Sequence, residues 1–351
     1  MGDAYNATIE RIKSQGGDKS RLGMAALMWI SHAERPLSAD GLCHALVVEL
    51  GSTDFNVDNA PTIATLVTCC EGLITVDKEG STVRLIHFTL QEYLSIRQDI
   101  FGRPHSTIAE TCLTIMNSQQ VKAISADPYP IAKVTDFLEY CSLNWGAQAK
   151  RDLSDSARPL ALVLLRECDN HISLKLLMME YVSADFKAFD SDFAFSGLDC
   201  ASFFGIGDLV AALIKMECYD INKGGLWGNT PLKWAAWNGH EEVVKILLNY
   251  EAVDPDKPDE LGFTPLSSAA VNGHEGVVNV LLRQEKVNPN KPDNSGRTPL
   301  SYAAETRHEG VVKILLGREV VNPHVADHGG RTPVAYAAQR GNKEMIKILF
   351  A

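Results

Sequence analysis

Histidine residues are the chemically reactive side chains whose spacing stands out most in this 351-residue sequence. His240, His274 and His308 recur at intervals of 34 residues. If they occupy equivalent positions of stacked helical repeats, they lie about 10 Å apart, because packed helices are separated by roughly that distance. A zinc–nitrogen bond is only about 2 Å long. The three histidines are therefore predicted to be structural, and the sequence predicts no metal site.

His87 is a different case, because it stands alone in RLIHFTLQEYL, residues 84–94, where a strand-like run passes directly into a helix-like run. If the chain bound a nucleotide through a phosphate-binding loop, the sequence would contain GxxxxGK[ST], because successive backbone N–H groups of that loop surround the phosphates. The closest candidate is KSQGGDKS, residues 13–20, in which Lys13 and Asp18 occupy the two glycine positions. Asp18 would repel phosphate, so this candidate fails.

No other catalytic motif is evident. The sequence has neither a GxSxG nucleophile elbow nor an HExxH zinc motif. Asp190-Ser191-Asp192 is similar to a metal-binding DxD, but a turn between two helices explains it better. The sequence therefore predicts no catalytic residue, no cofactor and no enzyme activity.

Composition restricts the partners and the compartment. The formal net charge of −11 disfavours nucleic acid as a partner, because such a surface repels phosphate backbones. The eight cysteines form no CxxC pair and fall in apolar helical patterns, so we expect buried free thiols in a reducing compartment. The first residues, MGDAYNATIERIK, lack the hydrophobic core expected of a signal peptide, and no apolar run approaches the roughly 20 residues of a membrane span. We predict a cytoplasmic protein without a membrane partner.

Four similar stretches occupy the C-terminal half, and the first is GNTPLKWAAWNGHEEVVKILL. Their threonines, each followed by proline, are 34 residues apart: Thr230, Thr264, Thr298 and Thr332. Thr230 can cap a helix, with proline harmless at the first helical position. Gly239 suits the left-handed conformation that ends that helix. An earlier, degenerate copy keeps the period, because Gly205 precedes Gly239 by 34 residues.

These motifs resemble the ankyrin repeat over residues 193–351, with a degenerate first copy and a truncated last one. The histidine that the family carries after TPL is replaced, and Arg307 stands where the pattern has glycine. A non-glycine residue in the left-handed conformation costs roughly 1 kcal/mol or more, so we expect the third full repeat to form the weakest joint.

The N-terminal third has the parts of a small winged-helix module. Residues 20–33 form an apolar helical stretch, Ser38 can cap a second helix, and residues 60–74 read as a third. Two β-rich runs around Gly80 then predict a hairpin.

The run from IERIKSQ to RLIHFTLQEYL, with IAETCLTIMN and FLEYCSLNWGAQAKRD further on, resembles fungal NACHT–ankyrin proteins, which are NLR-like receptors, without their ATPase core. The predicted fold is mainly α: a winged-helix-like domain at 1–103, a helical linker at 104–192 and an ankyrin solenoid at 193–351. In that family the histidine at the position of His87 reads nucleotide phosphates. Here either its ring nitrogens are satisfied locally, or it acts as a sensor when a separate ATPase core docks on this chain.

Ankyrin arrays bind partners through hairpin tips and the concave face of the inner helices. The residues predicted to bind are Leu226, Trp227, Trp237, Leu261, Phe263, Val271, Arg297, Arg331 and Arg340. Asn229 is expected to be exposed beside them, whereas Trp234 is expected in the core. An apolar end beside a basic strip suggests a protein segment with a hydrophobic anchor followed by acidic residues. The alternative is that the helical linker covers the aromatic residues.

The favoured function is a non-enzymatic recognition or scaffold module that binds a protein partner. One rival is a regulatory fragment that docks in trans on a NACHT ATPase core through residues 85–94. The other is an enzyme or small-molecule binder with a pocket between the helical linker and the repeats.

Overall fold

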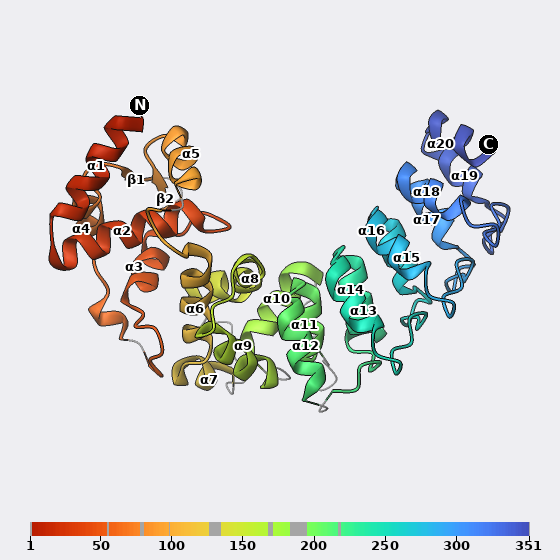
Figure 1. The fold of residues 1–351 in the computed structure, drawn as a ribbon, viewed down its shortest axis with the longest axis horizontal. Helices are drawn as coiled ribbons and strands as arrows, with labels where there is room; N and C mark the ends of the chain where they lie inside the picture. Colours follow the sequence, from red (N-terminus) through yellow and green to blue (C-terminus); the bar gives the residue numbers. More distant parts are fainter. Residues whose placement is uncertain are drawn as a thin grey trace. The chain divides into compact units, whose positions relative to one another are not determined.

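The computed structural model describes residues 2–54, 56–77, 81–97, 99–125, 135–167, 171–182, 195–216 and 219–350. Within these ranges the chain is mainly helical, and a two-stranded antiparallel sheet is the one sheet found there, as predicted. The chain divides into two compact units, Met1–Phe189 and Asp190–Ala351 (Figure 1). The predicted Asp190-Ser191-Asp192 turn, Gly80, Cys168 and Cys218 lie outside the described residues.

The first part of unit 1 contains the predicted helices and hairpin. Its elements are α1 (Gly2–Ser14), α2 (Gly17–His32), α3 (Ala39–Val47), the 3₁₀ turn η1 (Val57–Asn59), α4 (Ile63–Cys69), β1 (Ile74–Val76), β2 (Val83–Leu85) and α5 (Phe88–Ile96). Ser38 caps α3 as expected, because its side chain accepts a hydrogen bond from Gly41 N. β1 pairs with β2 with Ile74 opposite Leu85.

Two details of this region differ from the predictions. The helix predicted at residues 60–74 is shorter, because Glu71 and Gly72 adopt left-handed backbone conformations that end α4. Helix α1 was not predicted from the sequence. It is anchored by Ile9 and Ile12, which are fully buried.

The second part of unit 1 is a helical layer. It comprises α6 (Pro104–Met116), α7 (Gln119–Ser125), α8 (Asp136–Arg151), α9 (Ala157–Arg166) and α10 (Ile172–Val182). Helices α6 and α8 lie side by side (Figure 1). The Trp145 side chain of α8 is fully buried. Six cysteines among the described residues are free and buried, as expected: Cys43, Cys69, Cys70, Cys112, Cys141 and Cys200.

Unit 2 is a series of helix pairs. The inner helices are α11 (Gly197–Phe204), α13 (Pro231–Trp237), α15 (Pro265–Val271), α17 (Pro299–Glu305) and α19 (Pro333–Gln339). The outer helices are α12 (Gly207–Lys215), α14 (Glu241–Leu248), α16 (Glu275–Leu281), α18 (Glu309–Leu316) and α20 (Lys343–Phe350), and a 3₁₀ turn η5 (Leu226–Gly228) precedes α13. Successive inner helices stack on one another (Figure 1). Each repeat threonine caps its inner helix, as predicted: Thr230, Thr264, Thr298 and Thr332.

The recurring histidines join one repeat to the next. Their Nε2 atoms donate to backbone carbonyl oxygens of the preceding repeat: His240 to Phe203 at 2.8 Å, His274 to Trp237 at 2.9 Å and His308 to Val271 at 3.1 Å. Each ring packs directly on the left-handed glycine of the preceding repeat, and a Cβ there would collide with it. The histidines are therefore structural, and the glycines serve both backbone conformation and packing.

Arg307 breaks this pattern, and the next repeat changes with it. Arg307 has a left-handed φ of 67°, as predicted from its alignment with glycine. The following repeat carries Asn342 where the others carry histidine, so no ring needs the vacant space. Arg307 Nη2 instead donates to the Arg340 carbonyl oxygen at 2.6 Å. At this joint the side chain of the earlier repeat donates to the backbone of the later one, whereas at the other joints the later repeat donates to the earlier one. This hydrogen bond offsets part of the destabilisation expected from the left-handed Arg307.

Candidate partner-binding surface

Three of the hairpin tips are each organised by one aspartate, whereas the first tip, which carries Leu226 and Trp227, has Gly225 at that position. Asp259 Oδ1 accepts hydrogen bonds from the backbone N–H groups of Leu261 and Phe263, both at 2.8 Å. Asp293 and Asp327 repeat this arrangement in the next two tips. A carboxylate that accepts two backbone N–H bonds fixes the loop around it. The residues of these three tips are therefore held in place before any partner arrives, and the first tip is closed instead by a backbone bond from Gly225 N to the Asn229 carbonyl oxygen at 2.8 Å.

Neighbouring tips are also tied to each other through the backbone. Glu260 N donates to the Trp227 carbonyl oxygen at 3.1 Å, and Asn294 N donates to the Leu261 carbonyl oxygen at 3.0 Å. A third bond continues the series from His328 N to the Ser295 carbonyl oxygen. Trp227 and Leu261 consequently occupy equivalent, adjacent positions on a continuous row.

Three large apolar side chains on this surface are strongly exposed. The exposed fractions are 48% for Trp227, 43% for Trp237 and 67% for Leu261. Leu226 and Val271, also predicted to bind, are half-buried. Trp227 also has a left-handed backbone with φ 57°, which costs a residue with a Cβ roughly 1 kcal/mol or more. Backbone strain that holds an exposed aromatic residue is typical of functional positions.

Phe263 is less available than the sequence suggested. The centroids of the Phe263 and Tyr302 rings are 4.5 Å apart, and Lys233 Nζ lies 5.7 Å from the centroid of the Phe263 ring. Phe263 is thus half-buried in the tip and supports it from within.

A buried ion pair lies under this tip, and sequence reasoning did not anticipate it. Lys233 Nζ pairs with Asp259 Oδ2, and each side chain is only 7% exposed. Nζ also donates to Asn229 Oδ1 at 2.6 Å, so Asn229, expected to be exposed, is buried. Burial lowers the pKa of Lys233, although the hydrogen bond to Asp259 opposes this shift. The lysine that replaces the family's histidine therefore links the first full repeat to the tip of the second.

Two of the three basic residues of the predicted strip, Arg297 and Arg331, stack on tyrosine rings. The Arg297 guanidinium carbon lies 3.9 Å from the Tyr302 ring centroid and 4.1 Å from that of Tyr336. Arg331 lies over the same Tyr336 ring at 4.9 Å. Arg297 also pairs with Glu305, which leaves its side chain mostly buried. Arg297 is therefore largely a packing residue between two repeats.

Arg331 and Arg340 remain more than half exposed, but each has a carboxylate partner. Arg331 pairs with Asp327 at 3.1 Å and Arg340 with Glu305 at 2.8 Å. Partial burial alone would raise the pKa of Glu305, but its two arginine partners lower it overall. The strip therefore carries a smaller net positive charge than its three arginines suggest.

His87 lies in unit 1 and caps α5. Its Nδ1 accepts a hydrogen bond from Thr89 N at 3.2 Å, so one ring nitrogen is satisfied locally. The ring is exposed and lies beside Phe88, with 4.7 Å between the ring centroids. Ile86 and Phe88 are exposed on either side of it.

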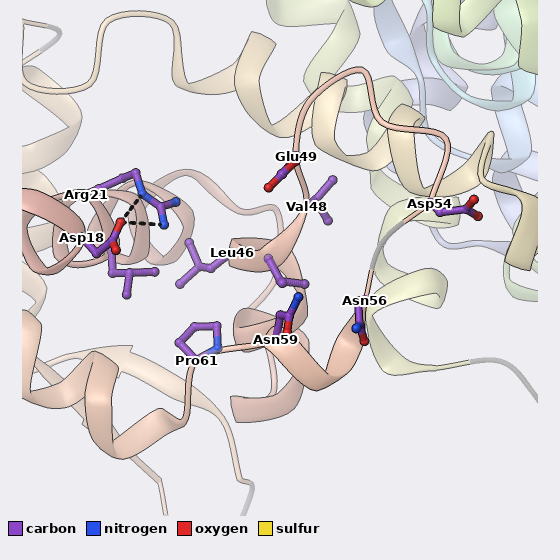
Figure 2. Close-up of a pocket in the computed structure, with 11 residues that line it drawn as sticks. Asp18, Arg21, Leu46, Val48, Glu49, Asp54, Asn56, Asn59 and Pro61 are labelled. Atoms are coloured by element: carbon purple, nitrogen blue, oxygen red, sulfur yellow. Dashed lines mark hydrogen bonds and ion pairs between the residues drawn. The ribbon is translucent and has the colours of Figure 1, made fainter.

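The cavity in Figure 2 has a volume of about 510 Å³ and is lined by residues of α2, α3 and the segment around η1. Its rim carries Asp18, Glu49 and Asp54, and Arg21 hydrogen-bonds to Asp18. Within the described ranges, no three histidine, cysteine or acidic side chains are placed to hold a metal ion. Lys19 and Ser20, the pair considered for a phosphate-binding loop, lie inside α2 rather than in a loop.

Among the helices that the structure describes, none has both the length and the apolar character needed to cross a membrane.

Comparison with known protein families gives two matches. Residues 198–293 and 285–351 match the model for ankyrin repeats. Residues 10–115 match the model for the winged helix domain of GPI inositol-deacylase. A comparison with curated proteins found no match. Neither matched module is itself catalytic, and ankyrin repeats serve protein–protein interaction in general. The chain thus combines a winged helix domain of the GPI inositol-deacylase type with C-terminal ankyrin repeats.

Proposed function

We propose that the ankyrin array binds a protein partner through the tips and inner-helix ends of its first two full repeats, and that the chain acts without catalysis. The observation that carries this proposal is the exposure of Trp227 and Leu261 on hydrogen-bonded hairpin tips and of Trp237 at the end of α13. Exposed tryptophan is among the residue types most enriched in binding hot spots. Preorganised loops lose little conformational entropy when a partner binds.

The character of the surface changes along the array, which suggests how the partner lies. From the first full repeat to the fourth, the residue at the hairpin tip is Trp227, then Leu261, Ser295 and Gly329. In the same order, the last residue of the inner helix is Trp237, Val271, Glu305 and Gln339. Both series change from apolar to polar between the second and third full repeats. A matching segment has an apolar anchor over the first two repeats and acidic residues near Arg331 and Arg340.

The order of the two modules supports a class for the protein. A winged helix domain followed by ankyrin repeats is the arrangement that the resemblance to NACHT–ankyrin proteins implies. This protein is accordingly proposed to be the recognition part of a cytoplasmic, NLR-like receptor of fungal type. The proposal includes the domain boundaries expected from the sequence, which separate the winged-helix-like domain from the helical linker after residue 103 and the linker from the ankyrin repeats after residue 192.

The test is capture of partners by the chain and by a Trp237→Ala, Leu261→Ala double variant. These positions are preferable to Phe263, because truncating Phe263 would also remove support from the tip. Val320→Ala is the matched control, since Val320 is an exposed apolar residue of the same unit outside the proposed surface. A partner retained by the native chain and the control, but lost by the double variant, supports the proposal. Equal retention by all three refutes it.

A second function is favoured by the exposed residues around His87. Ile86 and Phe88 leave an apolar surface there, on which a separate ATPase core would dock in trans. His87→Ala should then weaken nucleotide retention by that core, whereas His87→Asn keeps a side chain able to cap α5 and controls for the loss of the cap. If neither the binding of a separately expressed core nor its nucleotide retention changes with His87→Ala, this function is excluded.

A further inference from the structure

A second cavity of unit 1, of about 470 Å³, is lined mainly by basic and titratable side chains. It lies where the C-terminal ends of α2, α5 and α8 meet the start of α6. The residues that define its character are His32, His105, Arg97, Arg103 and Arg151. His87 is not among its lining residues.

Both histidines have their Nδ1 atoms engaged by the protein. His105 Nδ1 lies 2.6 Å from Gln148 Oε1, and the buried Gln148 amide is fixed by a 2.8 Å bond from its Nε2 to the His32 carbonyl oxygen. Oε1 can only accept, so His105 Nδ1 carries a proton. His32 Nδ1 lies 2.8 Å from Ser31 Oγ and 3.2 Å from the Met28 carbonyl oxygen. Because the Ser31 hydroxyl donates to the Leu27 carbonyl oxygen at 2.6 Å, it accepts from His32 Nδ1, which is therefore also a donor.

This arrangement leaves the two Nε2 atoms as acceptors while the rings are neutral. Neither Nε2 has a hydrogen-bond partner within the described part of the chain. The ring centroids of His32 and His105 are 5.4 Å apart. Protonation would turn both Nε2 atoms into donors and would add two positive charges within one cavity.

The arginines are oriented by carboxylates but keep free donors. Two nitrogens of Arg103 contact Asp152, and two of Arg151 contact Glu34. Arginine has five N–H donors, so each guanidinium can offer others to a ligand.

The positive groups that line the cavity besides the histidines are Arg97, Arg103 and Arg151, and the negative groups are Glu34 and Asp152. Asp99 does not line the cavity but pairs with Arg97. The ion pairs leave little excess charge while the rings are neutral, and protonation of the histidines adds up to two positive charges.

We propose that this cavity binds a small dianion of the phosphate type, and that binding is coupled to protonation of His32 and His105. A bound dianion would offset the mutual repulsion of the positive charges that line the cavity, which are those of the three arginines and the two protonated histidines. Burial lowers the pKa of His32, and the positive charges of His105 and Arg151 lower it further, whereas the bond to Met28 opposes this. A bound dianion reverses the unfavourable contributions, so binding takes up protons and tightens as pH falls.

Titration calorimetry of the full chain with sulfate tests the proposal. Sulfate is the first probe because it carries two charges throughout the range from about pH 8 to about pH 6, where the ordinary pKa of histidine lies. At constant ionic strength we expect at least about tenfold tighter binding at the lower pH, since uptake of one proton per bound anion gives up to tenfold per pH unit. The heat should also depend on the ionisation enthalpy of the buffer.

His105→Gln and Arg103→Gln should each weaken binding, and the first should also reduce the pH dependence. His44→Gln and Arg166→Gln are matched controls, because they remove the same residue types from unit 1 without lining the cavity. Absence of binding at the lower pH, binding that does not change with pH, or equal losses in the control variants would overturn the proposal.

Inorganic phosphate and vesicles that contain phosphatidic acid then separate the sources of the anion. A recessed cavity predicts binding of inorganic phosphate with the same dependence on His105. Binding to vesicles alone would contradict a small soluble ligand.

Discussion

Removal of the buried Lys233 amine should loosen the tip of the second full repeat. Lys233→Met keeps most of the side-chain volume but leaves the Asp259 carboxylate buried without its cation and Asn229 Oδ1 without its donor. Breaking a buried ion pair from one side typically costs about 3–5 kcal/mol. Asp259 keeps its two backbone donors at 2.8 Å, so the lower end, about 3 kcal/mol, applies.

The matched control is Lys245→Met in the same unit. Lys245 pairs with Glu241, but their side chains are 54% and 45% exposed, and such helix-surface pairs contribute about 0.3–0.5 kcal/mol. Hydrogen exchange of the Leu261 and Phe263 amides measures the effect, because both donate to Asp259. A change of about 3 kcal/mol in local opening accelerates their exchange by about 100-fold or more. Similar exchange rates in the two variants would refute the assigned role of the buried pair.

Three further predictions concern stability. His171 Nε2 donates to the Met116 carbonyl oxygen, and burial lowers the pKa of His171 from 6.5 to about 4. The unfolded chain therefore takes up this proton first as pH falls, and the free energy of unfolding should drop by roughly 3 kcal/mol between about pH 6.5 and 4; His171→Gln should remove this pH dependence from denaturant unfolding. Arg307→Gly loses the bond to Arg340 but also the left-handed strain, each about 1 kcal/mol, so its unfolding midpoint should stay near that of the native chain, whereas Arg307→Ala keeps the strain and should lower it. Thr264→Ala removes a helix cap and should cost about 1 kcal/mol in the same assay.

The repeat architecture could be predicted because local backbone chemistry determines it. A threonine that caps, a proline that follows it and a glycine that adopts a left-handed conformation act within a few residues of one another. The same local logic placed Arg307 correctly in a left-handed conformation. It failed at α4, where Glu71 adopts a left-handed conformation that its residue type does not signal.

The details of the candidate surface depend on contacts between repeats, which periodicity does not reveal. Lys233 meets Asp259 across 26 positions of sequence, and Arg297 is held between tyrosines of two different repeats. Such contacts decide which variable residues are exposed and which are packed. Trp227 and Leu261 are exposed, whereas Arg297 is largely buried, although sequence position alone gave all three the same role.

Site-specific photo-crosslinking tests the central claim, recognition through the tips of the first two full repeats, most directly. A photoreactive amino acid replaces Leu261 in one sample and Val320 in another, since both side chains are exposed and only Leu261 lies on the proposed surface. The account predicts a crosslinked protein partner from position 261 that is absent from position 320 and is lost when Trp237→Ala is added. The same products from both positions, or crosslinks from position 261 only to residues of this chain's own unit 1, would contradict it.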